Sequence, residues 1–191
     1  MDMINVLDKV QPKNKEQLKQ LINYAFKHNI YDLNFIDTSE ITDMSWLFED
    51  VRYNFDVSKW DVSNVTNMST MFYCCYDFNC DLSNWNVSNV TDMYALFCEC
   101  NKFTGKGLEH WDASNVTDMA GMFVGCENFN CDLSNWDVSK VTNMDNMFDG
   151  CKKFNCDLSD WDISNVKRWK NMFVGCDKMT IPNWYKLYHK K

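Results

Sequence analysis

Proline and glycine are scarce in this 191-residue chain, which has 2 Pro and 6 Gly. That scarcity excludes collagen-like chains, proline-rich linkers and the glycine-rich rolls that bind calcium. No run of 18 apolar residues occurs, so the sequence predicts no membrane span. The first residues, MDMINVLDKVQPKNKEQ, show no basic start followed by an apolar stretch. We therefore expect no secretory signal and, by default, a cytoplasmic location.

The composition is otherwise that of a folded protein, with 46% hydrophobic and 24% charged residues. Charge is unevenly distributed: residues 1–31 carry +2, residues 32–163 carry −16 and residues 164–191 carry +6, which gives the net charge of −8. An acidic body repels nucleic-acid phosphates, so we expect no DNA or RNA partner. The basic C-terminal end is either a second contact surface or a solvated face.

Tryptophan recurs at an almost constant interval. It stands at positions 60, 85, 111, 136 and 161, separated by 25, 26, 25 and 25 residues. Each Trp opens a similar phrase, clearest in WDVSNVTNMSTMFYCCYDFNCDLSN, and a degenerate copy begins at Ile36. One such unit is too small to bury its own apolar stripe, so neighbouring units must stack. The sequence therefore predicts a solenoid of about six 24–26-residue repeats over residues 32–180.

The apolar positions within one repeat predict a short strand followed by one turn of helix. Leu82, Trp85 and Val87 follow the L-x-x-L-x-L spacing of leucine-rich repeats, and the period of two around Trp85 favours a strand. Thr91 is a candidate N-cap for a helical or 3-10 turn. The apolar stripe of that turn would be Met93, Leu96 and Phe97. We therefore expect a β-containing, leucine-rich-repeat-like coil.

Both ends of such a stack need covers, because an open coil exposes its core. Residues 14–28, NKEQLKQLINYAFKH, carry apolar residues at helical spacing and predict a capping α-helix with Asn14 as its N-cap. We assign residues 1–31 to this N-terminal cap region. Residues 181–191, which follow the last repeat and contain Pro182, are expected to form the C-terminal cap and a basic tail.

The phrase F-N-x-D-L-S-x-W-D-V-S-N-V-T-N-M-x-x-M-F, repeated in register over about residues 11–180, resembles a family of bacterial surface-protein repeats. These 25–26-residue repeats occur in Listeria, mycoplasma and spirochaete proteins and are grouped with the BspA-like leucine-rich repeats. The resemblance implies a right-handed β-containing solenoid and a role in adhesion or protein interaction, without catalysis. Many members are exported to the cell surface, whereas this sequence shows no signal for export. The buried Asn ladder of ordinary leucine-rich repeats is replaced by Val65, Val90, Val116, Val141 and Val166.

The ten cysteines recur at two shared repeat sites, with Cys74 and Cys98 as additional residues. The first site holds Cys75, Cys100, Cys126, Cys151 and Cys176, and the second holds Cys80, Cys131 and Cys156. One interpretation is two ladders of small buried side chains, which is the usual position of free Cys. The alternative is a thiol-rich metal-binding or redox-responsive protein, since pairs such as Cys75/Cys80 form C-x₄-C. Zinc sites generally use tighter pairs that converge from two segments, so we expect no metal and no cofactor.

Polar residues form outward columns beside the Trp–Val phrase. A bound cation, a basic partner or the seryl hydroxyls would offset the like charges stacked there. We interpret these columns as a partner-binding face, because extended surfaces are what repeat proteins usually offer. The alternatives are a calcium-binding acid ladder and solvated Asp residues that only hold turns. The proposed face comprises Asp61, Ser63, Asn86, Ser88, His110, Asp112, Ser114, Asp137, Ser139, Asp162 and Ser164.

Catalytic motifs are absent from the sequence. His28, His110 and His189 lie far apart along the chain, and no phosphate-loop, dinucleotide, zinc-protease or nucleophile-elbow pattern occurs. Gly105 and Gly107 coincide with the 26-residue interval and predict a loop insertion. We therefore expect no catalytic residues and no enzyme activity. The sequence favours a monomeric protein–protein interaction or adhesion module without membrane insertion, for an unidentified protein partner whose basic charge would suit the acidic face.

Overall fold

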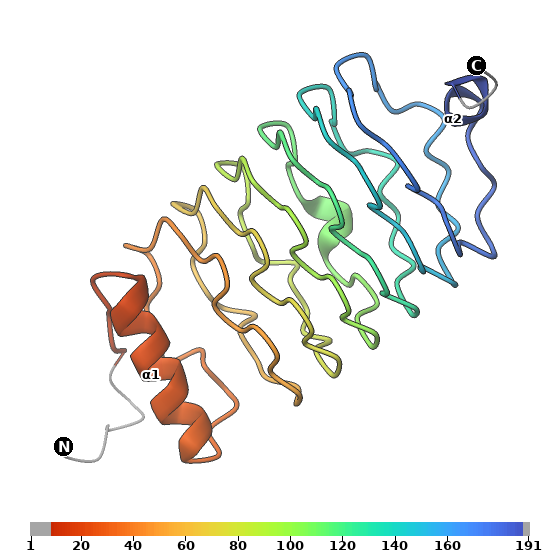
Figure 1. Cartoon of the computed structure of the whole chain (residues 1–191). Coiled ribbons are helices and arrows are strands. Elements are labelled where there is room, and N and C mark those ends of the chain that lie inside the picture. Colours follow the sequence, from red (N-terminus) through yellow and green to blue (C-terminus); the bar gives the residue numbers. More distant parts are fainter. Residues whose placement is uncertain (1–8, 189–191) are drawn as a thin grey trace.

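The structure is a computed structural model that describes residues 9–188. Successive segments of about 25 residues follow one another as coils in a single stack (Figure 1). Helix α1, Lys15–Lys27, lies at one end of the stack and helix α2, Asn183–Tyr188, at the other. A 3-10 helix, η1, Leu108–His110, lies between them in sequence. Within residues 9–188, no helix is long and apolar enough to cross a lipid bilayer.

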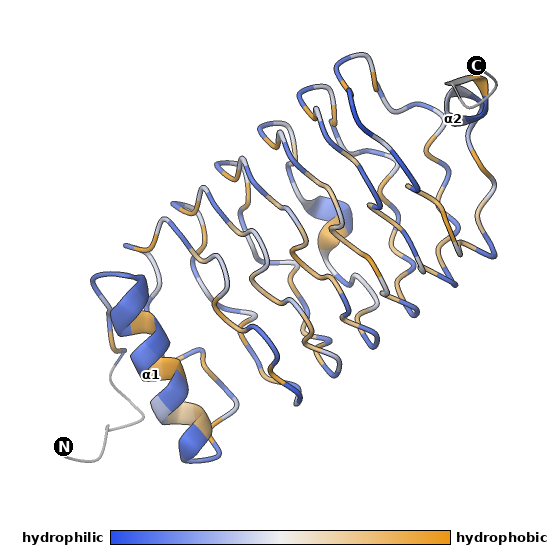
Figure 2. Ribbon diagram, viewed as in Figure 1, coloured by the Kyte–Doolittle hydropathy of each residue, from blue (hydrophilic) through white to orange (hydrophobic). Residues whose placement is uncertain are grey.

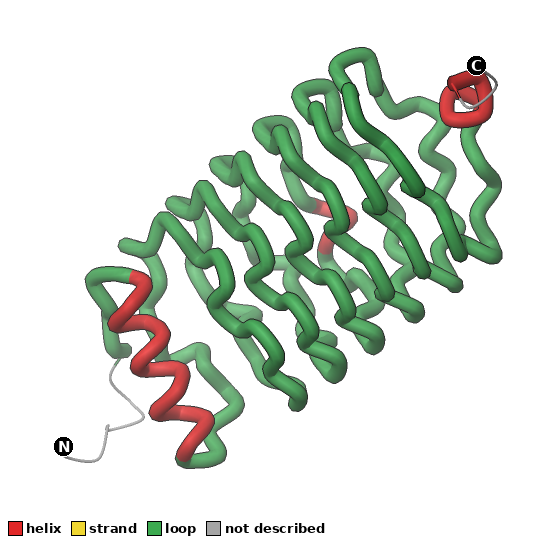
Figure 3. The backbone as a smooth tube through the Cα atoms, viewed as in Figure 1, coloured by secondary structure: helices red, strands yellow, loops and turns green. Residues whose placement is uncertain are grey.

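The expected β-containing leucine-rich-repeat coil is wrong. Residues 9–188 contain no β-strand and no sheet, but only isolated parallel bridges between neighbouring coils, and α1 is their only helix of seven or more residues. Nearly the whole chain is therefore drawn as loop (Figure 3). The predicted strand at Trp85–Val87 lies between two turns, where Trp85 N–H bonds to the Leu82 carbonyl and Val90 N–H to the Val87 carbonyl.

Left-handed residues explain why no strand forms where the coils pair. We call residues 66–75 a ladder segment, with counterparts at 42–51, 91–100, 117–126, 142–151 and 167–176. The fifth and ninth residues of every ladder segment have positive φ, for example Thr70 at 56° and Cys74 at 59°. An L-residue in this region turns the chain and interrupts an extended run. The predicted helical turn at Met93–Phe97 is wrong for the same reason, since Ala95 has a φ of 50°.

Backbone hydrogen bonds in a ladder segment alternate between the next coil and the same coil. Thr70 N–H bonds to the Tyr94 carbonyl at 2.7 Å and Phe72 N–H to the Leu96 carbonyl at 3.0 Å. Between them, Met71 N–H bonds to the Met68 carbonyl at 3.1 Å, within one coil. Half of the donors therefore join the coils and the other half fold each coil back, which satisfies the buried backbone without a sheet.

Aromatic columns form the shared interior. Consecutive Phe rings of the ladder segments lie nearly parallel, with centroids 5.4–5.8 Å apart. These are Phe48, Phe72, Phe97, Phe123, Phe148 and Phe173. Trp85 stacks on Trp111 at 6.2 Å, and Trp111 stacks on Trp136 at 6.4 Å. Apolar and polar residues alternate along each coil (Figure 2), as a thin coil with one dry side requires.

Each buried Trp is also tied to the preceding coil by a hydrogen bond. The Trp85 indole N–H bonds to the Val57 carbonyl at 3.0 Å, and that of Trp136 to the Leu108 carbonyl at 2.8 Å. Trp184, in α2, continues the series by donating to the Leu158 carbonyl at 2.9 Å. Tryptophan is suited to this position because it combines a large apolar ring with one donor that needs a partner when buried.

The helix expected over residues 14–28 is present as α1. Its N-cap is Asn14, whose side chain accepts a hydrogen bond from Gln17 N–H at 3.0 Å. Leu18, Ile22 and Ala25 are buried against the first coil. At the other end, the Tyr185 ring meets Phe173 edge-on at 5.0 Å. The predicted tail residues His189, Lys190 and Lys191 lie outside the described residues.

Aspartate and asparagine hold the turns of each coil. Ser58 N–H bonds to the Asp56 carboxylate at 2.8 Å, Ser63 N–H to Asp61 at 3.0 Å, and Ser69 N–H to the Asn67 side chain at 2.9 Å. These are Asx turns, in which a side-chain oxygen accepts the backbone N–H two residues later. A further Asn ladder, which the sequence did not reveal, joins the coils: Asn79 N–H bonds to the Asn54 side chain at 3.0 Å.

Gly107 gives the most direct test of how closely the coils approach. Its φ is 97°, and a Cβ placed there would lie 2.2 Å from the backbone nitrogen of Ser83 in the preceding coil. Gly121 is a matched control. Its φ is 64°, a Cβ placed there would lie 3.6 Å from its nearest neighbour, Val124 Cγ2, and Ala95 occupies the equivalent position in the preceding coil. We expect Gly107→Ala to lower the free energy of unfolding by about 3 kcal/mol and Gly121→Ala by about 1 kcal/mol. Urea unfolding followed by Trp fluorescence measures both, and equal losses would contradict the close approach.

Candidate functional site

The predicted Asp–Ser face exists as a surface column, and its side chains are engaged in turns. Asp61, Asp112, Asp137 and Asp162 are exposed, and each accepts the N–H of the serine two residues later at 2.9–3.0 Å. In the same column, Asn86 does so at 3.1 Å. The serines are Ser63, Ser88, Ser114, Ser139 and Ser164. Nothing about this geometry identifies a ligand, so the partner-binding role of this face stays a prediction.

His110 lies apart from the turns of this column. It ends η1, and its imidazole is 3.8 Å from the Glu109 carboxylate with 70% of the side chain exposed. His28 contacts the Tyr24 carbonyl and ring near the end of α1. Within the described residues, both histidines therefore make only local contacts.

The first cysteine ladder is hydrogen-bonded to the backbone, and all of its members except the half-buried Cys176 are buried. Each thiol donates to a Phe carbonyl of the preceding coil, for example Cys75 Sγ to Phe48 at 2.9 Å and Cys126 Sγ to Phe97 at 2.9 Å. Burial raises the pKa of Cys75 to about 12 and raises the pKa of Cys100 and Cys126 as well. The thiolate is the reactive form of Cys, so these residues are poor nucleophiles and poor metal ligands at neutral pH.

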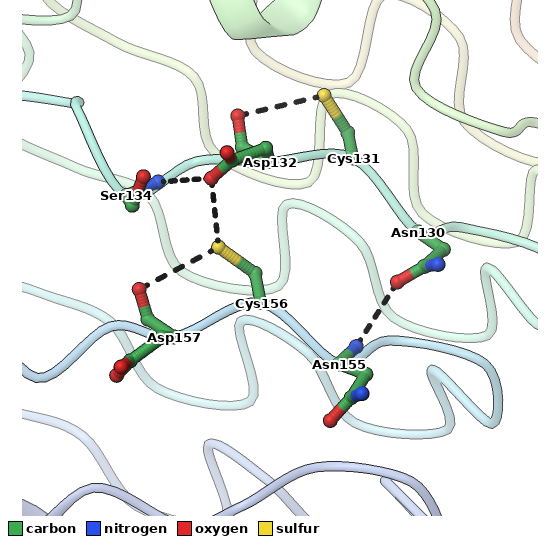
Figure 4. A pocket seen from close by; sticks show the side chains of 7 residues that line it. All are labelled: Asn130, Cys131, Asp132, Ser134, Asn155, Cys156 and Asp157. Atoms are coloured by element: carbon green, nitrogen blue, oxygen red, sulfur yellow. Dashed lines mark hydrogen bonds between the residues drawn. The ribbon is translucent and has the colours of Figure 1, made fainter.

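Cys131 and Cys156 of the second cysteine ladder line a small hollow of 360 Å³ (Figure 4). Here Cys156 Sγ donates to the Asp132 carboxylate at 3.3 Å and accepts from Leu133 N–H at 3.2 Å. Beside it, Asn155 N–H bonds to the Asn130 side chain at 3.1 Å. The polar groups therefore bond to one another across two coils. In the part of the chain that the structure describes, no group of three or more His, Cys, Asp or Glu side chains could hold a metal ion.

A larger hollow of 630 Å³ lies on the outer surface of the ladder segments, which we call the ladder face. Its floor is made of small residues, Ala95, Ala120 and Gly121. Tyr73 and Tyr94 stand on one side, and 49% of the Tyr94 surface is exposed. The hollow is also lined by polar and charged residues of this and the following coils, namely Asp118, Asn143, Asp145, Asn146, Asp149 and Arg168. Trp46, 45% exposed, extends the aromatic side with its ring 6.1 Å from Tyr73.

Two repeat positions that line the hollow differ from coil to coil. The fourth residue of the ladder segment is Ser45, Ser69, Tyr94, Ala120, Asp145 and Lys170 in the six coils. The eighth residue is Glu49, Tyr73, Cys98, Val124, Asp149 and Val174. An alignment of the repeat copies reveals this variation from the sequence alone. The predicted Asp–Ser face, in contrast, consists of positions that hardly vary between copies. Sequence reasoning therefore missed the ladder face.

Hydrogen bonds in the Asx turns shift carboxyl pKa values. The following serine lowers the pKa of Asp112, Asp137 and Asp162, and Lys106 together with Ser83 lowers the pKa of Asp81 to about 2. In the opposite direction, burial and then the charge of Asp118 raise the pKa of Asp92. A carboxylate with a lowered pKa stabilises the fold fully above its unfolded pKa and loses that contribution as the pH falls through its folded pKa.

We therefore expect the free energy of unfolding to be nearly constant between about pH 7 and pH 5 and to fall between about pH 4 and pH 2. The triple variant Asp112→Asn, Asp137→Asn, Asp162→Asn should fold, because Asn86 already occupies this repeat position. Its stability should fall less steeply with acid, since the amide keeps the acceptor but does not titrate. Urea unfolding at several pH values measures both slopes, and coincident slopes would contradict this role of the turns.

A protein-family profile described as "Mycoplasma protein of unknown function, DUF285" matches the chain twice, over residues 16–107 and 91–187. The two overlapping matches indicate a repeat-containing family of the mycoplasma type. They do not confirm the expected BspA-like leucine-rich-repeat assignment. No curated protein and no solved structure matches the sequence. Because the matched residues extend from 16 to 187, the chain belongs to the family described as Mycoplasma protein of unknown function, DUF285.

Proposed function

We propose that this protein is a non-catalytic protein-interaction module that holds its partner on the ladder face. The observation that carries the proposal is the variation of the fourth and eighth ladder residues, which line the hollow in the central coils. In a repeat stack, every copy must meet the same packing and hydrogen-bonding demands, so structural positions become alike. Positions without a packing or hydrogen-bonding role can differ between copies. A partner that is not itself repetitive can be recognised only if successive coils present different side chains to it.

The constant positions all have a structural role. The Trp, Phe and Cys columns are buried and bonded to neighbouring coils, and the aspartates of the D-x-S phrases accept backbone N–H groups. The fourth and eighth ladder residues take part in the ladder through their backbone, as in the bond from Gly121 N–H to the Asp145 carbonyl at 2.8 Å. Among the described residues, Ser45 and Asp145 are held by Lys15 and Arg168, whereas the side chains of Tyr94 and Asp149 form no ion pair and are available to a partner.

A non-catalytic role also agrees with the distribution of reactive groups. The buried thiols have raised pKa values, and the described histidines make only local contacts. An adhesion role, as implied by the resemblance of the repeat phrase to BspA-like bacterial surface proteins, would use the same surface. The acidic Asp–Ser columns stay our second predicted contact surface, and one experiment separates the two.

Tyr73→Val and Tyr94→Ser replace the tyrosines by residues that other coils carry at the same positions, Val124 and Ser69, so the double variant should fold. Proteins captured from native lysate by the immobilised wild-type chain should bind this variant at least about five-fold less, because exposed aromatics commonly anchor interfaces. The triple Asn variant of the Asp–Ser column should capture them normally. Quantitative mass spectrometry of the captured proteins measures both. Loss with the Asn variant alone would transfer the function to the Asp–Ser face, and unchanged capture by both would refute an interaction through either.

A further inference from the structure

The middle of the ladder face carries carboxylates that have no cationic neighbour of their own. The Asp92 carboxylate accepts Tyr94 N–H at 2.9 Å. Asp118 accepts Ala120 N–H at 2.8 Å and the Asn143 amide at 3.0 Å. Among residues 9–188, neither of them forms an ion pair, and neither does Asp149.

The two ends of the same face show how it accepts a cation. At the N-terminal end, Lys15 of α1 places its ammonium 3.1 Å from Asp43 and 2.6 Å from the Ser45 hydroxyl, the second and fourth ladder residues. At the C-terminal end, the Arg168 guanidinium contacts Asp145 at 2.6 and 2.8 Å. On the ladder face, the described residues therefore place a cation beside Asp43 and Asp145 but none in ion-pair contact with Asp92, Asp118 or Asp149.

The uncompensated carboxylates are neighbours. Asp92 and Asp118 are paired by a parallel bridge between adjacent coils, so two like charges face each other across the ladder. Like charges directly opposite each other are destabilising, and a cation placed between them would reverse the sign of the interaction. The raised pKa of Asp92, caused by burial and by Asp118, is consistent with this repulsion.

The tyrosines of the hollow could pack against the aliphatic stem of a lysine or arginine side chain. Tyr94 stands beside the small residues Ala95 and Ala120, which leave room above the backbone. Lysine and arginine stems pack on apolar and aromatic surfaces while their charged ends stay polar, and a cation over a tyrosine face gains further attraction. A basic side chain could therefore lie over the floor with its charge directed to Asp118 and Asp149.

We propose that the ladder-face hollow binds an extended segment of a partner protein through its lysine or arginine side chains. This inference rests on the proposed function and adds the chemistry of the partner. The net charge of −16 over residues 32–163 favours the approach of such a segment. Neighbouring coils lie about 4.8 Å apart, so a segment crossing two coil spacings covers about 10 Å, or three extended residues. Basic residues at every third position would then meet every second coil of the face.

The test uses a fluorescent peptide of about twelve residues with Lys at every third position and Ser between, and a matched peptide with Glu in place of Lys. Fluorescence polarisation with the full chain should show binding of the Lys peptide and none of the Glu peptide. Binding should weaken as salt is raised from about 0.05 to 0.5 M, because salt screens charge pairs.

Two variants with the same change in charge separate the hollow from general attraction. The hollow variant is Asp118→Asn with Asp149→Val, for which Asn143 and Val124 are the precedents in other coils. The control variant is Asp137→Asn with Asp162→Asn, on the Asp–Ser column. We expect about ten-fold weaker binding of the Lys peptide by the hollow variant and less than about two-fold weakening by the control.

Equal weakening in both variants would overturn the proposal, because net charge alone would then explain binding. Absence of Lys-peptide binding, or equal binding of the Glu peptide, would overturn it too. Such results would reject only the basic-segment proposal. The interaction role itself is tested separately by the lysate-capture experiment, so failure of one proposal can be distinguished from failure of the other. A loss confined to the hollow variant would support the basic-segment assignment.

Discussion

The structure depends on register between coils that cannot enclose a core alone. One coil of about 25 residues exposes on each side the aromatic rings and backbone groups that the next coil covers. The ladder donors and the indole N–H groups find their acceptors only when each residue meets its equivalent one repeat away. Any shift in register would separate the Phe column and leave buried donors without partners, which is costly in a dry interior. The helices at the two ends matter because they cover the faces that no further coil protects.

This constraint divides the surface into two kinds of position. Residues that keep the register or hold the turns, such as Trp85, Phe97 and Asp112, change little from copy to copy. Residues that join the coils only through their backbone, such as Tyr94 and Asp149, have changed from coil to coil and surround the hollow on the ladder face. Exposed polar residues in a constant column are therefore weaker evidence of function than exposed residues in a variable one, and here the aspartates of the constant column hold turns.

The repeat, its buried columns and the first helix could be predicted from the sequence, because apolar spacing and capping residues are local signals. The absence of strands from residues 9–188 could not be predicted, because it depends on Thr70, Cys74 and Ala95 adopting positive φ, which these residue types rarely do. Gly121 at the fifth ladder position, and Gly125 and Gly150 at the ninth, were the sequence evidence for positive φ at these positions. The aspartates of the Asp–Ser columns lie on the surface as expected, whereas the hollow depends on residues from five coils that only the stacked structure brings together.

Residue-resolved amide hydrogen exchange tests the register between coils most directly. Amides that donate to the next coil, such as those of Phe72, Ala95 and Phe97, should exchange at least about 100-fold more slowly than turn amides held by a side chain, such as those of Ser63 and Ser114. In the ladder segments, slow exchange should be centred on the middle coils. Equally fast exchange of the two groups, with no protected amides in the ladder segments, would contradict an inter-coil ladder and with it the account of the fold and its binding face.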